Sequence, residues 1–206
     1  IARMAWQKKG NYMVFFPSYR LMEDVHAVYQ NEFAARWVQC ICQTSSMNER
    51  EREEFLMEFT EEKKETLLGF CVMGGIFSEG IDLMGDRLIG VAVVGTGLPM
   101  VSGEREILKQ YFDQKGENGF DYAYRYPGIN KVLQSAGRVI RTKEDRGTIL
   151  LMDDRFLDRD YRNLFPREWS DLQICSLETV EIQLKEFWIS VEGMDYNKKE
   201  NKQENH

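Results

Sequence analysis

Three polar side chains in the segment LQSAGRVIR (133–141) are spaced so that together they could hold an anion. Gln134, Arg138 and Arg141 are separated by four and then three positions, which places them on one face of a helix. Guanidinium groups donate paired hydrogen bonds to phosphate oxygens, so this face suits a phosphate chain. Gly137 lies beside it and leaves room for a ligand or another backbone to approach. The alternative is a surface helix whose arginines form ordinary ion pairs with Asp or Glu.

A glycine-rich segment, GGIFSEGIDL (74–83), carries a second group of polar residues. It follows an apolar run, and it combines Gly80 with Ser78, Glu79 and Asp82. The backbone N–H groups of such a turn suit phosphate or sugar oxygens. The alternative is plain turn chemistry, in which these residue types serve only the local backbone. The segment is not a P-loop, because no G-x-x-x-x-G-K-[ST] sequence occurs in the chain.

Short apolar runs alternate with helical patterns and supply the elements that would position these residues. The expected strands span 11–16, 37–43, 67–73, 88–95 and 147–153. This alternation predicts an α/β fold with a mainly parallel sheet and helices on both faces. Ligands of such sheets bind at the carboxyl ends of the strands. The loops after Phe16, Met73, Val94 and Asp153 are therefore expected to carry the function.

Helical patterns fill the intervals between the runs. The expected helices span 2–9, 19–33, 102–114, 129–141 and 176–191, with one more after a Ser-x-x-Glu capping box at 46–49. Ser18 and Ser102 are expected to cap the helices that follow them. The residues expected on buried helix faces are Leu21, Val25, Val28, Tyr29, Phe55, Leu56, Phe59, Val132, Ala136, Val139, Ile140, Val180, Leu184 and Phe187.

The composition is that of a globular protein with a sizeable core. The chain has 206 residues, 43% of them hydrophobic, and a net charge of -7. This acidity argues against a protein that coats nucleic acid by bulk charge, but it allows a narrow basic track. No apolar run is long enough for a membrane span, and no signal peptide is visible. The chain starts at Ile1 rather than Met, so a fragment of a longer protein is expected.

The four cysteines include a C-x-C pair, Cys40 and Cys42, which a strand would point to the same side. No C-x-x-C pair occurs, so we expect packed, reduced thiols rather than a zinc site. Reduced thiols in turn fit a cytoplasmic protein.

The segments NYMVFFPSY, SEGIDL and QSAGRVIR occur in this order and resemble motifs IV, V and VI of superfamily 2 helicases. More closely, they resemble the XPD/DinG-like branch of DNA helicases, in which a strand like DRGTILLMDDRF follows motif VI. The resemblance covers about residues 11–157. It implies a three-layer RecA-like domain of the P-loop NTPase type over residues 1–192, followed by a polar, flexible tail at 193–206.

The resemblance also implies roles for the motif residues. Arg138 and Arg141 would act as arginine fingers on ATP phosphates, and Gln134 would contact the γ-phosphate or its attacking water. The nucleotide-binding residues would be Glu79, Gly80, Asp82 and Gly137.

Three further residues, Ser18, Tyr19 and Ser78, would contact nucleic acid. An aromatic ring at position 19 could also stack on a base of a single strand.

The function implied by the resemblance is that of the second motor domain of an ATP-dependent DNA helicase with a role in DNA repair. Such a helicase moves along single-stranded DNA, 5′ to 3′ in this branch, and unwinds duplexes. ATP and Mg²⁺ would be held mainly by an N-terminal motor domain of the same polypeptide, so this chain alone should hydrolyse no ATP. An iron–sulfur cluster, where present, belongs to that other domain, and no membrane partner is expected.

Two alternatives stay open. The motor could belong to an RNA helicase or to a nuclease-associated translocase. The chain could also be a non-catalytic module that binds nucleotide or nucleic acid.

Overall fold

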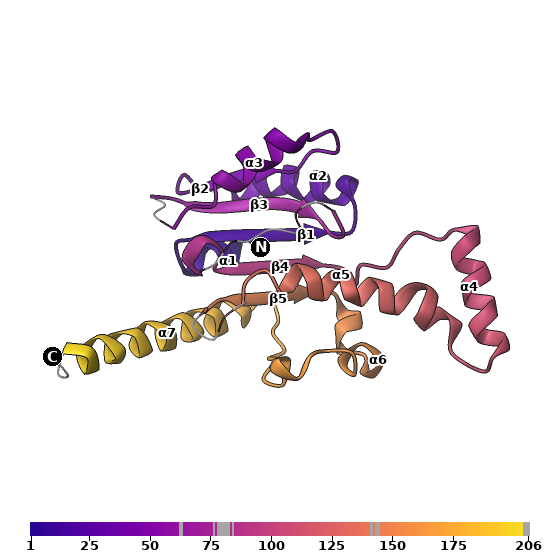
Figure 1. The fold of residues 1–206 in the computed structure, drawn as a ribbon. Coiled ribbons are helices and arrows are strands. Elements are labelled where there is room, and N and C mark those ends of the chain that lie inside the picture. The colour runs from indigo at the N-terminus through magenta and orange to yellow at the C-terminus, as the bar shows by residue number, and fades with distance from the viewer. Residues whose placement is uncertain are drawn as a thin grey trace.

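A five-stranded parallel sheet forms the centre of the molecule in the computed structural model (Figure 1). The structure describes residues 1–61, 64–75, 77, 83, 85–140, 142 and 145–203, and only the backbone of 194–203. The strands are β1 (Asn11–Phe16), β2 (Val38–Cys42), β3 (Thr66–Val72), β4 (Gly90–Val94) and β5 (Thr148–Met152). Their order is β2-β3-β1-β4-β5, and every pairing is parallel. The predicted strands and their parallel pairing are confirmed.

Helices connect the strands and cover both faces of the sheet. The α-helices are α1 (Ala2–Gln7), α2 (Tyr19–Val28), α3 (Glu49–Met57), α4 (Gly103–Gln114), α5 (Tyr126–Ala136), α6 (Arg159–Arg162) and α7 (Val180–Gln203). Two π-helical segments, η1 (Tyr29–Phe33) and η3 (Asp121–Arg125), continue α2 and precede α5. The shorter 3-10 segments are η2 (Gly85–Arg87), η4 (Asp154–Leu157) and η5 (Arg167–Trp169).

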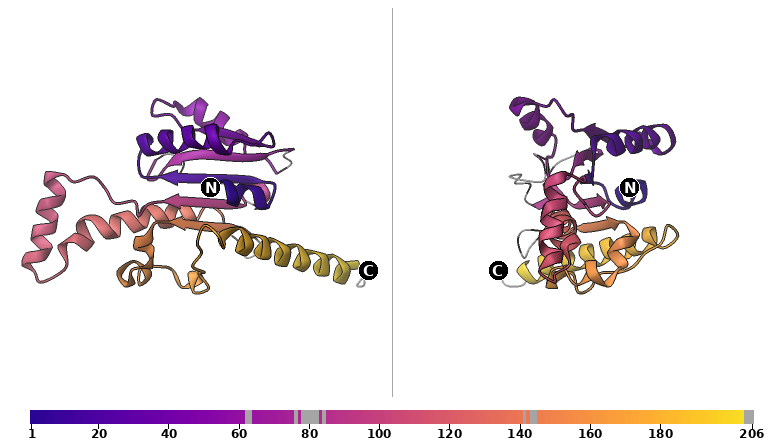
Figure 2. Two further views of the ribbon diagram at one scale, coloured as in Figure 1. Left: turned by 180° about the vertical axis from the view of Figure 1, so that it is seen from behind. Right: turned by 90° about the vertical axis from the view of Figure 1, so that its right-hand side faces the viewer.

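Alternate residues of the strands feed two separate apolar clusters, one on each face. On the face that we call the α5 face, Met13 and Phe15 of β1 pack with residues of α3 and α5. On the opposite α2 face, Tyr12, Val14 and Phe16 pack with residues of α1, α2 and α7. The edge-on view of Figure 2 shows the resulting three layers. All six side chains of β1 are buried, as expected for a central strand covered on both faces.

An arm made of α4, η3 and the start of α5 projects beyond the sheet (Figures 1 and 2). Arg105 on α4 donates to the carbonyl of Ala123, with 2.8 Å between Nη1 and the oxygen. The rings of Phe112 and Tyr122 stack, with 3.8 Å between their centroids. These contacts fasten α4 to η3. The predicted start of α4 is confirmed, because Ser102 accepts a hydrogen bond from the backbone N–H of Arg105.

The predicted limits of two helices, α3 and α5, were wrong. The capping box of α3 is formed by Asn48 and Glu51, three positions later, rather than by the Ser-x-x-Glu at 46–49. The helix predicted over 129–141 starts earlier, at Tyr126, because Pro127 fits the first turn of a helix. It ends at Ala136, so Arg138 follows the helix instead of lying within it.

Some predicted helix faces were also wrong. Tyr29 is buried as predicted, but the core-facing residue of α2 is Met22, whereas Leu21 and Val28 are exposed. Ile140 is also exposed, because the backbone leaves the helix before it. Val132, Ala136 and Val139 are buried as predicted.

The last helix is longer than predicted. It buries Val180 and Leu184 as expected, and it also buries Trp188 and Val191. Its backbone stays helical to Gln203, although the sequence predicts a helix only to about residue 191.

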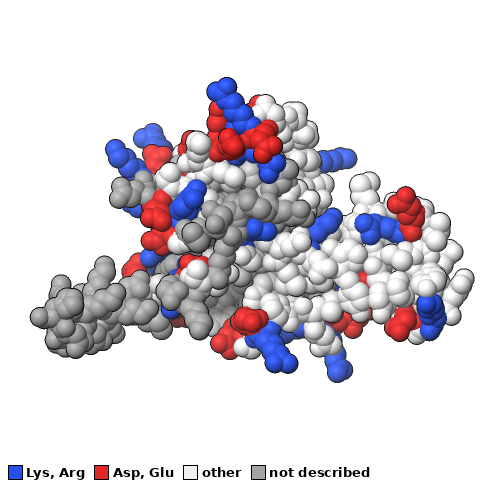
Figure 3. Space-filling model, viewed as in Figure 1, with Lys and Arg blue, Asp and Glu red and all other residues white. Residues whose placement is uncertain are grey.

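The charged side chains drawn in Figure 3 are mixed in sign over the visible face rather than gathered into one basic track. This agrees with the net charge of -7. In the part of the chain that the structure describes, no helix has both the length and the apolar character needed to cross a membrane.

Candidate nucleotide and nucleic-acid site

A polar stripe runs along α5 and its end. Lys131, Gln134 and Arg138 are three and then four positions apart, so they follow one side of the helix. Gln134 is exposed, and Arg138 is partly exposed. The Nε of Arg138 donates to the main-chain carbonyl of Gln134 at 3.2 Å, so these two predicted residues are in contact. This bond occupies a carbonyl of the last helical turn and fixes the base of the guanidinium group.

The N-terminal half of α5 is held against the loop that follows β4. Gly97 has a φ of 67°, and a Cβ added to it would lie 2.7 Å from the carbonyl oxygen of Gly128. A Cβ on Gly128 would meet the carbonyl oxygen of Thr96 at the same distance of 2.7 Å. The two backbones therefore touch at a place where only glycine fits on either side. This contact sets the position from which the polar stripe of α5 starts.

Lys131 lies between the loops after β3 and β4, and the sequence analysis missed it. A Cβ on Gly74 would lie 3.1 Å from both Cδ and Cε of Lys131. A Cβ on Gly97 would lie 3.5 Å from its Cβ. The Lys131 side chain therefore passes directly beside Gly74, at the end of β3. The helical spacing of Lys131 to Gln134 was a usable signal in the sequence.

The other end of the stripe lies toward the amino ends of the strands. A Cβ on Gly147, just before β5, would overlap Cγ1 of Val139 and would lie 2.8 Å from the carbonyl of Ile89, just before β4. Arg138, next to Val139, is therefore remote from the carboxyl ends. Gln134 and Arg138 therefore do not lie in the loops after the strands, where the sequence analysis expects the functional residues. The reason is that α5 runs antiparallel to the sheet and carries them to its opposite edge.

Ser18 and Tyr19 do lie at the carboxyl end of β1. The Oγ of Ser18 accepts a hydrogen bond from the backbone N–H of Leu21 at 3.3 Å, so Ser18 caps α2 as predicted. The Tyr19 ring is partly buried against the cluster of the α2 face. These two residues and the α5 stripe thus lie on opposite faces of one sheet.

A buried amide, Gln43, connects three strand ends and was also missed by the sequence analysis. Its Nε2 donates to the hydroxyl oxygen of Tyr19 at 2.8 Å, and its Oε1 accepts from the backbone N–H of Val72 at 2.9 Å. Its side chain follows β2, Tyr19 follows β1, and Val72 ends β3. Burial raises the pKa of the Tyr19 phenol, so its hydroxyl keeps its proton at neutral pH. Gln43 therefore links the motif IV turn to the start of the glycine-rich segment.

Asp153, at the end of β5, is engaged by Arg155. The Nε and Nη2 of Arg155 lie 2.8 and 2.7 Å from its two carboxylate oxygens, and the backbone N–H of Arg155 also donates to it. The hydrogen bonds from Arg155 hold the pKa of the Asp153 carboxyl below its usual value. This carboxylate is the N-cap of η4 and therefore has a structural role.

We expect Asp153→Asn to lower the free energy of unfolding at pH 7 and to have much less effect in acid. A carboxyl whose pKa is depressed in the folded state stabilises the fold above its unfolded pKa of about 3.9, and this contribution is lost as the pH falls through the folded value. Urea unfolding of the wild type and the variant between pH 2 and pH 7 measures the difference. A difference that stays constant over this range would contradict the role of the ion pair.

Several predicted site residues lie outside the described residues: Ser78, Glu79, Gly80, Asp82 and Arg141. Their neighbours Phe77 and Leu83 are buried in the cluster of the α5 face. The Phe77 ring lies 4.4 Å from the Phe55 ring, measured between centroids. Both flanking residues therefore lie on the face that carries Gln134 and Arg138.

The described cysteines have the properties of packed thiols. Cys40 and Cys42 both pack against the cluster of the α2 face, as the strand pattern predicts. Burial raises the pKa of the Cys40 thiol to about 11 and that of Cys42 to about 12. Among the described residues, no three His, Cys, Asp or Glu side chains are grouped so that they could hold a metal ion.

Comparison with known proteins assigns the chain to a protein family. The model of the family described as "Helicase C-terminal domain" matches residues 1–171. The chain belongs to this family. Its match includes all five strands and the α5 stripe, so the RecA-like fold and the motif IV to VI assignment agree with the family.

Curated relatives of this helicase C-terminal domain are named helicases or nucleases. A "Regulator of telomere elongation helicase 1 homolog" of Aedes aegypti is 34% identical over 71% of this chain and 16% of its own length. A "Probable ATP-dependent helicase" of Methanocaldococcus jannaschii is 25% identical over 72% of this chain and 24% of its own. The "3'-5' exonuclease DinG" of Bacillus subtilis is 26% identical over 80% of this chain and 17% of its own. The chain therefore spans less than a quarter of the length of these relatives.

A solved structure titled "XPD_APO" has the same fold. It superposes with a TM-score of 0.62 over 78% of this chain and 32% of that chain, at 22% identity. A second one, titled "XPD_Helicase", superposes with a TM-score of 0.60 at 21% identity.

Proposed function

We propose that this chain is the second motor domain of an ATP-dependent helicase that acts on single-stranded DNA. The observation that supports this most directly is the α5 stripe, in which Gln134 and Arg138 present an amide and a guanidinium on the face opposite Tyr19. One rigid sheet connects these proposed nucleotide-contacting and strand-contacting residues. Closure on a nucleotide at one face then moves the strand-contacting face as a body.

The α5 face suits the phosphates of ATP. Arg138 and Lys131 carry positive charge, Gln134 adds an amide donor, and Gly137 adds no side chain between them. ATP would supply a phosphoryl group whose transfer to water releases free energy. Arg138 would stabilise the negative charge on that group, and Gln134 would orient the attacking water or the terminal phosphate. Arg141, Glu79, Gly80 and Asp82 are proposed to share this site, on the resemblance to motifs V and VI.

An N-terminal motor domain of the same polypeptide would complete the site. Mg²⁺ and most of the nucleotide contacts are proposed to belong to it, because this chain has no P-loop. Movement from 5′ to 3′, a role in DNA repair and a cytoplasmic location are expectations from the resemblance and the composition.

On the α2 face, Gln43 could couple the binding of a nucleic-acid strand at Tyr19 to the position of the glycine-rich segment that follows β3. It holds the Tyr19 hydroxyl with one end of its amide and the last residue of β3 with the other. A shift of Tyr19 on strand binding would move this amide and with it the start of the segment at Gly74. Ser18 fixes the first turn of α2 and thereby the direction of the Tyr19 ring. Ser78 is proposed as a further strand contact.

Two substitutions of Tyr19 test the strand contact. We expect Tyr19→Ala to weaken binding of an oligo(dT) strand roughly tenfold or more, because stacking on an aromatic ring contributes about 1–3 kcal/mol per base. Tyr19→Phe keeps the ring and should keep most of the affinity, although Gln43 loses a hydrogen-bond acceptor. Fluorescence anisotropy with a labelled (dT)20 measures both variants. ATP hydrolysis without DNA should be nearly unchanged in the full polypeptide.

Unaltered strand affinity in Tyr19→Ala would overturn the assignment of this residue. An equal loss in Tyr19→Phe would place the role in the hydroxyl and its bond to Gln43 rather than in the ring. The same titration with oligo(U) separates a DNA motor from an RNA motor.

A further inference from the structure

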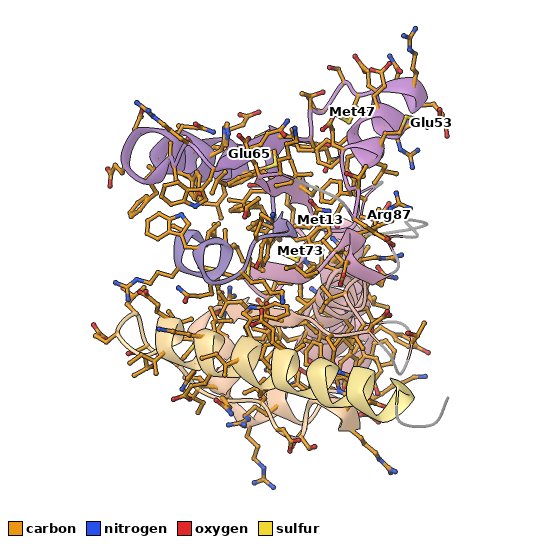
Figure 4. The ribbon with its side chains drawn as sticks, turned by 90° about the vertical axis from the view of Figure 1, so that its left-hand side faces the viewer. Met13, Met47, Glu53, Glu65, Met73 and Arg87 are labelled. Carbon is orange, nitrogen blue, oxygen red and sulfur yellow. The ribbon has the colours of Figure 1, made fainter. Side chains whose placement is uncertain are left out.

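A second aromatic site lies at the amino ends of the strands, on the opposite edge of the sheet from Tyr19. A cavity of about 280 Å³ is lined by Ala5, Trp6, Lys9, Trp37, Lys64, Glu65 and Thr66. Lys9 lies just before β1, Trp37 just before β2, and Lys64 and Glu65 just before β3. The chain thus brings α1 and three connections to one point. Figure 4 views the molecule from this side and labels Glu65 on this edge.

Two indole rings are exposed at this cavity. Trp6 is 43% exposed and Trp37 is 59% exposed, although large aromatic residues are usually highly buried. Trp188, by contrast, is only 4% exposed and packs in the cluster of the α2 face. Exposed indoles that line one cavity are suited to stacking against a flat ring.

Positive charge surrounds the two rings. Lys9 and Lys64 are exposed, and within the described part of the chain no carboxylate lies within ion-pair distance of either. The adjacent Lys8 differs, because its Nζ lies 3.0 Å from Glu192 and also above the Trp188 ring. Arg36, beside Trp37, is exposed as well. Lys9 and Lys64, which have no ion pair among the described residues, thus line a cavity with two indoles and one carboxylate, Glu65, and this lining suits an anionic ligand that carries a flat ring.

We propose that this cavity, the Trp6–Trp37 site, binds single-stranded nucleic acid at a point separate from the motif IV contact. A base would stack on an indole, and Lys9 and Lys64 would contact the flanking phosphates. Glu65 would accept a hydrogen bond from an N–H group of the base. The cavity is slightly smaller than pockets for drug-sized ligands, which suits one ring system with its phosphates outside.

The Trp6–Trp37 site is additional to the proposed function. It rests on that function only because both involve single-stranded nucleic acid as the ligand. β1 has six residues and a length of about 20 Å, so this site and Tyr19 are separated by about the height of the sheet. Both belong to the α2 face of the molecule, because α1 and Tyr19 pack in the same cluster. A nucleic-acid strand that contacts both sites would bind the domain with higher affinity than one that contacts Tyr19 alone.

Titration with a labelled (dT)20 tests the proposal. We expect Trp37→Ala to weaken binding roughly tenfold, and Trp37→Phe, which keeps a flat ring, to restore most of the affinity. The double variant Lys9→Ala/Lys64→Ala should weaken binding at low salt. It should also reduce the slope of log K against log salt by about 0.7 per lost phosphate contact. Lys185→Ala, which removes an exposed lysine of α7, is the matched control and should have no such effect.

Intrinsic fluorescence gives an independent readout. Two of the four tryptophans line the cavity, so (dT)20 should quench part of the emission, and a 20-mer of abasic sites should quench far less. Unchanged affinity and salt slope in the Trp37 and lysine variants would overturn the site and leave the cavity to a protein partner. Weakening by Tyr19→Ala alone would overturn this inference but not the proposed function. Failure of the wild type to bind any strand would overturn both.

Discussion

We expect Arg138→Ala to lower strand-stimulated ATP hydrolysis by about 10³-fold in the full polypeptide, while the domain stays folded. An arginine that stabilises charge on the transferred phosphoryl group contributes about 10³–10⁵ to turnover. Arg138 lies after α5 and its side chain is partly exposed, so its removal leaves no cavity in the core. Steady-state hydrolysis with saturating DNA and ATP measures the loss. Arg138→Lys should recover little, because lysine lacks the planar pair of donors.

Three comparisons make this result specific. Arg50→Ala removes an exposed arginine of α3 that pairs only with Glu54 among the described residues, and it should leave hydrolysis unchanged. Arg141→Ala should lose as much activity as Arg138→Ala if motif VI acts as the resemblance implies. Strand affinity without nucleotide should survive, because Arg138 lies on the face opposite Tyr19. Near-normal turnover of Arg138→Ala would remove this residue from the nucleotide site.

The second large effect concerns stability rather than chemistry. Gly128→Ala should lower the free energy of unfolding by about 1–3 kcal/mol, because its Cβ would lie 2.7 Å from the carbonyl oxygen of Thr96 and 3.1 Å from the backbone nitrogen of Leu98. Both neighbours are backbone atoms, so no side-chain rotation can make room. The loop after β4 and helix α5 must therefore move apart. This movement would also displace the polar stripe of α5 from Lys131 onward. Urea unfolding of the isolated chain measures the change.

Gly103→Ala is the control for this variant. Gly103 is the first residue of α4, and a Cβ there meets no atom within 4 Å. Alanine also reduces the freedom of the unfolded chain, so the variant should be unchanged or more stable by about 0.4–1 kcal/mol. A stability of Gly128→Ala equal to that of Gly103→Ala would contradict the close contact between the two backbones.

Local chemistry explains why much of the fold was predictable. Each strand is a short apolar run, and Ser102 is an N-cap with its helix directly behind it. Where two capping signals overlap, the sequence alone does not determine which of them starts the helix. Ser46-x-x-Glu49 and Asn48-x-x-Glu51 both read as capping boxes, and tertiary packing of Phe55 and Phe59 favours the second.

The parts that were not predictable depend on contacts between distant segments. Gln43 is polar and follows a strand of modest hydrophobicity, and only the parallel arrangement of β1, β2 and β3 brings it to Tyr19 and Val72. Gly97 and Gly128 meet because α5 crosses back over β4. The Trp6–Trp37 site likewise joins segments that precede different strands.

The central position of β1 in the sheet affects how the protein folds during its synthesis. This strand is synthesised before β3 and β4, yet Tyr12 pairs with Leu68 on one side and with Gly90 on the other, both far along the chain. On a ribosome, β1, β2 and β3 can form half of the sheet while β4 is still missing. The open edge of that half is the apolar strand NYMVFF, which could pair with other chains. Chains that stop before β4 should therefore aggregate, and folding should depend on how soon β4 closes that edge.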